Sequence, residues 1–362
     1  MKKQLLFLFL FATLHGCSWF SKSPRQHYEH QLRKEDKTLY TKWQAEIEKA
    51  FEEAGVVELP YSSSALLVKE RLHIYSYDVE LAVGEVFSAA VKTSIQGASI
   101  FLELFELDDG GQRTRKAYSK EGQLEYEVTQ SGHYKVLVAG EMGTISNYAF
   151  NMNTHPLYGF PLKGGKNSDI QSFWGAPRDG GARKHEGIDI FAPKGTDLVA
   201  VTDGTIERRT GGLGGKQIWL YDKARRIRIY YAHLDAQIAE DGAKVQKGEV
   251  VGTVGNTGNA RTTPPHVHFG TYLSKRGAVD PLGFVEIKPK ISGKKHAPLK
   301  GKGLAAALNN CRLLANPTSS AAVSGQLDEG TPFYVYASSG EYYYVRTPAG
   351  RAGFLPTNVV QW

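Results

Sequence analysis

The first region with a periodic pattern of apolar residues lies between Ser21 and Gly55. It is polar and charged apart from apolar residues at helical spacing, namely Leu39, Trp43, Ile47, Ala50 and Phe51. Residues three or four positions apart share one face of a helix, and glycine often follows a helix end. The pattern predicts a short amphipathic helix, which acts either as a stalk against the next domain or as a free tether.

Between about Leu59 and Thr154 the pattern changes to alternation of apolar and polar residues. The apolar members of the clearest runs are Ile100, Leu102, Leu104, Tyr134, Val136 and Val138. Such runs, separated by glycine-containing turns, predict an antiparallel β-sandwich. The stretch from Ser131 to Val136, together with Asn147-Tyr148, resembles the pre-peptidase carboxy-terminal type of sandwich found beside secreted peptidases.

A glycine-rich, strand-rich stretch follows Pro156 and runs to about Glu286, and a basic linker with Pro and Gly follows it. The last sixty or so residues contain short strands with glycine turns, which predict a small barrel. This part resembles the bacterial SH3-like domains of wall hydrolases. Its tyrosines, such as Tyr342, Tyr343 and Tyr344, either line a binding groove or fill the core.

The first sixteen residues predict export. Lys2 and Lys3 precede an apolar run from Leu5 to Phe11, which is too short to span a bilayer as a helix. The segment ends in Leu14-His15-Gly16-Cys17, which resembles the bacterial lipoprotein processing box and implies a lipidated Cys17. The alternative is an ordinary signal peptide followed by a chance cysteine. Cys311 is the only other cysteine, so disulfides are not expected to stabilise the chain.

The formal net charge of +7 favours an anionic partner such as the cell wall, although net charge mainly affects non-specific association. The chain has no glycine-rich phosphate loop ending in Lys-Ser or Lys-Thr. We therefore expect no nucleotide site, and as a separate expectation the partners do not include nucleic acid.

Four histidines lie in three short motifs between Lys184 and Phe269, and these motifs carry the expected chemistry. In an extended strand, positions two or four apart face the same side, so His185 is expected to project with Asp189, and His266 with His268. Imidazoles and one carboxylate are ligands that zinc accepts, with a fourth position left to water in catalytic sites. Arg178 and Asp179 precede the first motif, and each either contacts substrate or stabilises a turn.

These motifs resemble the lysostaphin-type, or LytM-family, zinc endopeptidases. The family hallmarks are a His-x-x-x-Asp pair, a later isolated His and a His-x-His pair, found here as His185 with Asp189, then His233, then His266 with His268. The resemblance covers about residues 161–285 and implies one zinc ion per chain, held by His185, Asp189 and His268. It also implies that His233 and His266 are catalytic, one as general base and the other steadying the oxyanion, in an order that the sequence leaves open.

The resemblance implies hydrolysis of peptide crosslinks or stem peptides in bacterial peptidoglycan. A polyglycine bridge and a D-alanyl-diaminopimelate crosslink are both within the family's range, and the anchor with Ser18 favours the second. The first alternative is a catalytically inactive wall-binding lipoprotein that activates another hydrolase, although such relatives typically lose metal ligands. A lipoyl-carrier-like barrel and a purely structural zinc site are less compatible with two histidines beyond the ligand set.

The expected fold is mainly β and multidomain, with a β-sandwich, an antiparallel LytM-type domain, an SH3-like barrel and a short N-terminal helix. The expected segments are a signal peptide 1–16, an anchor and helical stalk 17–58, a sandwich 59–154, a zinc peptidase domain 155–287, a basic linker 288–301 and an SH3-like domain 302–362. We expect a cell-envelope protein, facing the periplasm from the outer membrane in a Gram-negative organism and otherwise membrane-anchored and extracellular. The region before Pro156 is placed to inhibit the enzyme within the chain.

Overall fold

The computed structural model describes residues 22–67, 69, 72–94, 99–119, 121–144, 146–289, 295–299, 305–308 and 311–362. The predicted signal peptide, Cys17 and Ser18 lie outside these residues. The chain divides into two compact units, residues 1–45 and residues 46–362, and each is described by itself. Strands dominate the described residues, which confirms the prediction of a mainly β protein.

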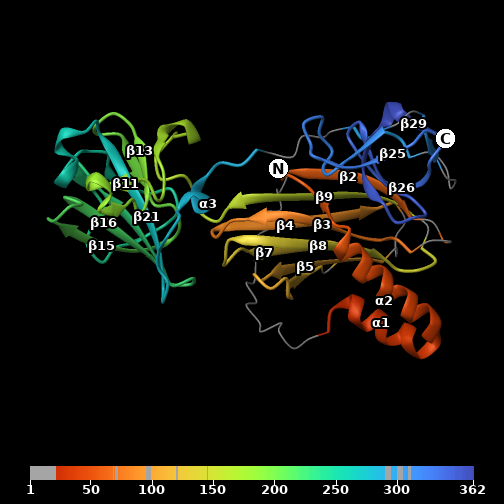
Figure 1. Cartoon of the computed structure of the whole chain (residues 1–362). Helices are drawn as coiled ribbons and strands as arrows, with labels where there is room; N and C mark the ends of the chain where they lie inside the picture. Colours follow the sequence, from red (N-terminus) through yellow and green to blue (C-terminus); the bar gives the residue numbers. More distant parts are fainter. Residues whose placement is uncertain are drawn as a thin grey trace, which may run out of the picture. The chain divides into compact units, whose positions relative to one another are not determined.

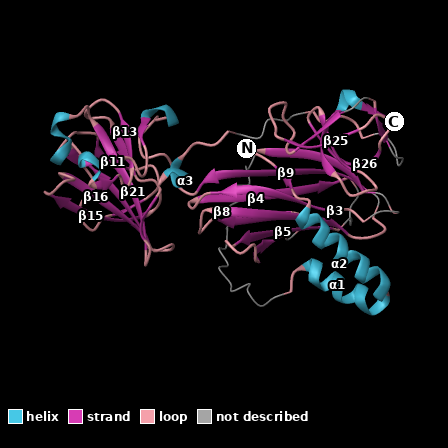
Figure 2. Cartoon of the chain, in the orientation of Figure 1, coloured by secondary structure: helices cyan, strands magenta, loops and turns pink. Residues whose placement is uncertain are grey.

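Two helices precede the first strand (Figures 1 and 2). Helix α2, Lys37–Glu52, contains all the apolar positions that predicted a helix. Helix α1, Pro24–Glu35, was not predicted because its sequence is almost wholly polar; it begins with a capping box between Ser23 and Gln26. No helix in the described part of the chain is long and apolar enough to cross a membrane.

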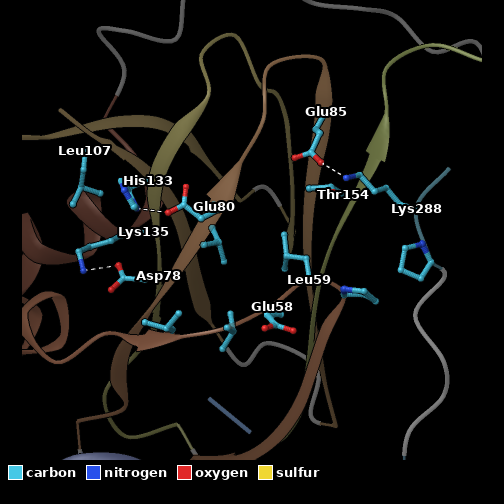
Figure 3. Close-up of a pocket in the computed structure, with 15 residues that line it drawn as sticks. Glu58, Leu59, Asp78, Glu80, Glu85, Leu107, His133, Lys135, Thr154 and Lys288 are labelled. Carbon is cyan, nitrogen blue, oxygen red and sulfur yellow. Dashed lines mark hydrogen bonds and ion pairs between the residues drawn. The ribbon is translucent and has the colours of Figure 1, made fainter. Parts of the chain in front are cut away.

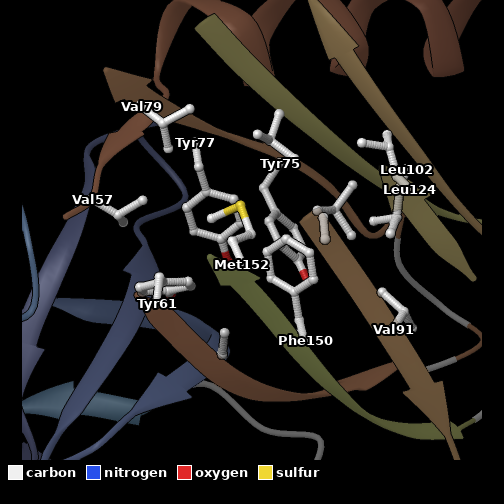
Figure 4. Close-up of a cluster of buried hydrophobic side chains, with 14 of the residues drawn as sticks. Val57, Tyr61, Tyr75, Tyr77, Val79, Val91, Leu102, Leu124, Phe150 and Met152 are labelled. Atoms are coloured by element: carbon white, nitrogen blue, oxygen red, sulfur yellow. The ribbon is translucent and has the colours of Figure 1, made fainter. Parts of the chain in front are cut away.

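Two layers of strands form a sandwich in the region where alternation predicted one. One layer has the order β1-β3-β8-β5-β6, and the other includes β2-β9-β4-β7. The strands are β1 (Gly55–Val56), β2 (Tyr61–Leu67), β3 (Ile74–Leu81), β4 (Glu85–Thr93), β5 (Ile100–Leu107), β6 (Arg113–Tyr118), β7 (Gln123–Glu127), β8 (Gly132–Gly140) and β9 (Ser146–Pro156). Aromatic rings fill much of the core between the layers, with Tyr77 stacked on Phe150 at 5.5 Å between centroids (Figure 4).

The C-terminal strands continue the second layer of the sandwich. They are β23 (Ala305–Ala307), β24 (Cys311–Leu314), β25 (Val323–Leu327), β26 (Pro332–Ser339), β27 (Tyr342–Arg346), β28 (Ala352–Pro356) and β29 (Val360–Gln361). Strand β26 pairs with β2, with Ser64 opposite Ser338 and their Oγ atoms 2.9 Å apart. The two regions therefore share one sheet. Tyr343 and Tyr344 are buried, so they belong to the core.

Most of residues 155–287 form a second β-sheet core, which begins after β9 ends at Pro156. The main sheet has the order β10-β13-β21-β17-β16-β15-β19, with β22 beside β21, and a smaller sheet has the order β14-β20-β18. The strands of the main sheet are β10 (Ile170–Ser172), β13 (Ile188–Phe191), β15 (Gly204–Thr210), β16 (Lys216–Asp222), β17 (Ile227–Ala232), β19 (Lys244–Val245), β21 (His266–Leu273) and β22 (Gly277–Val279). The remaining elements are β11 (Pro177–Arg178), β12 (Arg183–Lys184), β14 (Asp197–Val199), β18 (Ala236–Gln237), β20 (Val250–Thr253) and α3 (Leu282–Val285).

The turn between β3 and β4 connects the sandwich tightly to this second core. Val83 is 7% exposed and belongs to the apolar cluster of residues 155–287. Gly84 has φ +88°, and a Cβ there would lie 2.2 Å from Cδ2 of Phe284. Nearby, Arg225 donates to both carboxylate oxygens of Glu127, at 3.0 and 2.6 Å. The turn thus makes apolar contacts with the second core, and Glu127 at the end of β7 makes polar ones.

Candidate metal centre

Two neighbouring antiparallel strands bring Asp189 and His268 together. They are β13 and β21, and their register places Asp189 directly opposite His268. The next pair along the two strands, Ile190 on β13 and Val267 on β21, points to the other face of the sheet, where both side chains are fully buried. Alternation along β21 also puts His266 on the same face as His268, as predicted.

His185 reaches the same point from a loop and not from the continuous strand that the sequence predicted. It follows β12, and β13 begins only at Ile188. Its ring is held because Nδ1 donates to the carbonyl oxygen of Phe173 at 2.9 Å, which leaves Nε2 as the acceptor nitrogen. That Nε2 lies 3.0 Å from Oδ1 of Asp189 and 2.9 Å from Nδ1 of His268.

The ligand atoms of His185, Asp189 and His268 all lie within 4.8 Å of one another, so this group can hold a metal ion. His185 and Asp189 are buried, and the two imidazoles and one carboxylate form a donor set that suits zinc and similar divalent ions. A Cβ on Gly187 would lie 2.6 Å from Cε1 of His268. The glycine therefore leaves the space that the His268 ring needs, and the residues present fit a bound metal.

Arg178 supports this group from β11. Its Nη2 donates to Oδ2 of Asp189 at 2.7 Å and to Oγ of Ser172 at 2.7 Å. Burial opposes ionisation of Asp189, but the adjacent rings of His185 and His268 outweigh it and hold the pKa of this carboxyl well below its usual range. Because Oδ2 is engaged by Arg178, Oδ1 is the oxygen that faces both histidines. From the sequence, two roles were open for Arg178, contact with substrate or stabilisation of a turn. In the structure it contacts Asp189.

His233 and His266 lie beside the three candidate ligands. Their ring centroids are 5.1 Å apart, and His233 is 6.1 Å from His268. In each ring Nδ1 donates to a backbone carbonyl, that of Thr257 or Pro264, at 2.9 Å. In the neutral form of either ring, the free nitrogen is therefore Nε2, which carries the lone pair.

The backbone and the surroundings of His233 are both unusual. Its φ is +65°, in the left-handed region that non-glycine residues seldom occupy and that is often found at functional sites. Burial, followed by the neighbouring His266 and His268, lowers the pKa of His233 to about 4. The ring is consequently neutral near pH 7 and able to accept a proton.

A cavity of about 750 Å³ contains all five of these residues in its lining. Every lining residue lies between Ser172 and Tyr272, and the cations among them are Arg178, Arg183 and Lys184. Tyr230 and Tyr272 also line it, and the sequence analysis did not single them out. The available signal was the position of Tyr230 next to the buried Tyr231, since adjacent strand residues face opposite sides.

A second cavity, of about 790 Å³, lies in the sandwich (Figure 3). Its charged side chains are largely paired with one another: Glu80 with His133, Asp78 with Lys135, and Glu85 with Lys288. These side chains pair with one another across the wall of the cavity. The convergent metal-ligand group lies instead in the cavity around His268.

Comparisons with known proteins agree with this geometry. Residues 183–281 match the profile of Peptidase family M23. Three relatives match this part: an uncharacterized metalloprotease of Haemophilus influenzae, 35% identical over 29% of this chain; an L-Ala--D-Glu endopeptidase of Bacillus subtilis, 36% identical over 32%; and the DD-carboxypeptidase/endopeptidase Mpg of Neisseria meningitidis, 37% identical over 30%. The matches cover only 22%, 38% and 25% of those relatives' lengths, respectively. The likeness supports a peptidase domain of the predicted LytM type.

Proposed function

We propose that this chain is a zinc-dependent endopeptidase that hydrolyses peptide bonds in bacterial peptidoglycan. The observation that carries the proposal is the convergence of His185, Asp189 and His268 in one cavity with two further histidines. This group lies within the segment that matches Peptidase family M23. Two of the named relatives are endopeptidases, acting on L-Ala--D-Glu or DD bonds according to their names.

In this proposal His185, Asp189 and His268 hold one zinc ion. When bound, zinc supplies a Lewis acid that polarises the scissile carbonyl and lowers the pKa of water toward neutrality. Three protein ligands leave a position open, as in catalytic zinc sites and unlike closed structural ones.

His233 and His266 move protons at their Nε2 atoms. The carbonyls of Thr257 and Pro264 fix the other nitrogen of each ring, so both rings are oriented before substrate arrives. One Nε2 accepts a proton from the attacking water, and the other ring, when it is protonated at Nε2, donates a hydrogen bond to the tetrahedral oxyanion. Because both histidines occupy the same cavity in similar hydrogen-bonding settings, either assignment of these two roles fits.

The test uses the full mature chain and purified peptidoglycan. We expect one zinc ion per chain by elemental analysis, release of soluble fragments, loss of release with a chelator and recovery when zinc is restored. Binding of wall without zinc and without cleavage would contradict the proposal and favour the alternative, an inactive activator of another hydrolase. Mass spectrometry of the fragments identifies the bond that is cleaved. Of the two candidate bonds, we favour a D-alanyl-diaminopimelate crosslink over a polyglycine bridge.

We further propose that Cys17 is lipidated and anchors the chain in the cell envelope, at the outer membrane facing the periplasm in a Gram-negative host. In another host the same anchor would leave the protein membrane-bound and extracellular. Fatty-acid labelling of the wild-type chain, set against Cys17→Ala, tests this. Label retained by Cys17→Ala would refute it.

Inhibition by the region before Pro156 remains part of the proposal, and it predicts higher activity after removal of residues 18–154. Such a deletion also removes β2, which pairs with β26, and Val83, which packs in the second core. A thermal melt of the deletion variant must therefore accompany the assay. A cooperative melt with unchanged or lower activity would favour a substrate-positioning role for this region.

A further inference from the structure

An aromatic cluster lies on the outer face of the main sheet, next to the candidate metal centre. Trp219 on β16 is directly opposite Tyr230 on β17, and Tyr272 lies on the next strand, β21. The alternate residues Ile218 and Leu220 point into the core and are fully buried. The three rings therefore stand on the same face of the sheet as the side chains of Asp189 and His268.

The three rings are packed together and are continuous with the cavity. Ring centroids are 4.4 Å apart for Trp219 and Tyr230, and 5.1 Å apart for Trp219 and Tyr272. Tyr230 in turn meets His268 at 5.7 Å, edge to face. Tyr230 and Tyr272 line the cavity, and Trp219 packs against both of them, so the cluster begins at the cavity wall.

Two glycines allow the tyrosines to take these positions. A Cβ on Gly214 would lie 2.0 Å from the hydroxyl oxygen of Tyr230. Gly270 is opposite Tyr230 on β21, and a Cβ there would lie 3.3 Å from Cε2 of Tyr272. Larger residues at either place would displace a ring, so the cluster depends on local sequence beyond the aromatic residues themselves.

Trp219 presents carbon and not its polar atom to solvent. Its side chain is partly exposed, but Nε1 is buried and has no hydrogen-bond partner among the described residues. The guanidinium of Arg209 lies 5.5 Å from the Trp219 ring centroid and is also paired with Glu207. The exposed part of the Trp219 side chain is thus carbon, and it is bordered by charged groups that can hydrogen-bond to a ligand.

We propose that Trp219, Tyr230 and Tyr272 form a subsite for a sugar ring of the glycan strand, so that the enzyme acts on stem peptides still attached to sugar. This inference rests on the proposed function. One face of a pyranose ring is a set of C–H groups that stacks on aromatic rings, while its hydroxyl and acetamido groups point outward toward residues such as Arg209 and Glu207. Stem peptides are rich in alanine and carboxylates, which offer no comparable flat apolar face.

The dimensions of the cluster fit such a substrate. Ring-to-ring steps of 5.7 and 4.4 Å lead from His268 through Tyr230 to Trp219. The separation is therefore at most about 10 Å, which is the reach of about three extended residues. A sugar on Trp219 accordingly brings one of the first bonds of its stem peptide to the metal centre.

The test compares kcat/KM of the full chain on a disaccharide tetrapeptide and on the same tetrapeptide without sugar. We expect wild type to prefer the sugar-bearing substrate by about tenfold, the size expected from one good aromatic contact. Trp219→Ala should abolish that preference by raising KM for the sugar-bearing substrate, with kcat and the rate on the free peptide little changed. Trp219→Phe should restore part of the preference.

Tyr221→Ala is the matched control, because Tyr221 is exposed, lies on the same strand and the same face, and is two residues farther from the metal centre. It should behave as wild type. Equal wild-type rates on the two substrates, or an equal loss on both in a folded Trp219→Ala variant, would overturn the subsite. If Trp219→Ala does not fold, Trp219→Leu takes its place, with the same expected loss of preference. Failure of wild type to cut either substrate would instead count against the proposed function.

Discussion

Nη2 of Arg178 lies 2.7 Å from Oδ2 of Asp189 and donates a hydrogen bond to it. The same carboxylate has its other oxygen, Oδ1, 3.0 Å from Nε2 of His185 and 3.1 Å from Nδ1 of His268. Arg178 therefore holds Asp189 so that Oδ1 faces the two candidate histidine ligands. It does so from β11, a two-residue strand outside the main sheet.

Arg178→Ala should weaken zinc binding by about 10- to 100-fold, the usual effect of removing a group that orients a metal ligand. The reason is that Asp189 loses its partner and can rotate away from His185 and His268. Competition against a chromophoric chelator measures the affinity. Lys184→Ala removes a cation from the same cavity lining and serves as the control. Equal affinities for the two variants would show that Arg178 acts only through its charge.

Gly187→Ala should impair metal binding although residue 187 offers no ligand. A Cβ at this position would lie 2.6 Å from both Cε1 of His268 and the carbonyl oxygen of Phe269, so the ring or the strand must move. We expect a substoichiometric zinc content and a correspondingly low activity. Gly325→Ala is the control, since its nearest contact would be an ordinary 3.5 Å. Full zinc content in Gly187→Ala would mean that the site adapts without cost.

Local patterns predicted part of the arrangement of the candidate ligands, whereas the ligand set itself came from the family resemblance. His266 and His268 lie on one strand, so strand alternation alone places them on one face. Asp189 meets His268 because β13 and β21 are neighbours, which the motif implied only through its family resemblance. The detailed reason given for His185 was wrong, because a loop bends at Gly187 between His185 and β13.

Contacts between distant segments could not be read from local patterns. The pairing of Ser64 with Ser338 joins strands that are 274 residues apart, and neither strand carries a signal for its partner. The hydrogen bond from Arg178 to Asp189 likewise depends on the turn between β11 and β12. Helix α1 was missed for a different reason, since a polar helix with few buried residues lacks apolar periodicity.

His233→Ala and His266→Ala should each reduce kcat by about 10²- to 10⁴-fold, the range for loss of a general acid or base. Zinc content should stay at that of wild type, because neither residue belongs to the group of converging ligand atoms. His133→Ala, at an exposed position in the sandwich, controls for the substitution itself. Loss of zinc from either cavity variant would refute the separation of ligands from catalytic residues.

The turn that contains Gly84 should matter more for stability than an ordinary loop between two strands, because Gly84 is buried. Gly84→Ala places a Cβ 2.2 Å from Phe284 and also forces alanine to φ +88°, whereas Gly111→Ala meets a similar φ of +75° with nothing within 4 Å. Both variants bear the left-handed cost of about 1–2 kcal/mol, and only Gly84→Ala adds overpacking, of about 1–3 kcal/mol. Urea unfolding of the two variants against wild type measures the difference.

If the two variants lose the same free energy of unfolding, the contact between Gly84 and Phe284 does not hold the turn to the second core. A larger loss in Gly84→Ala, with one cooperative transition, would mean that the sandwich and the core of residues 155–287 unfold together, since Val83 of the same turn is buried in that core.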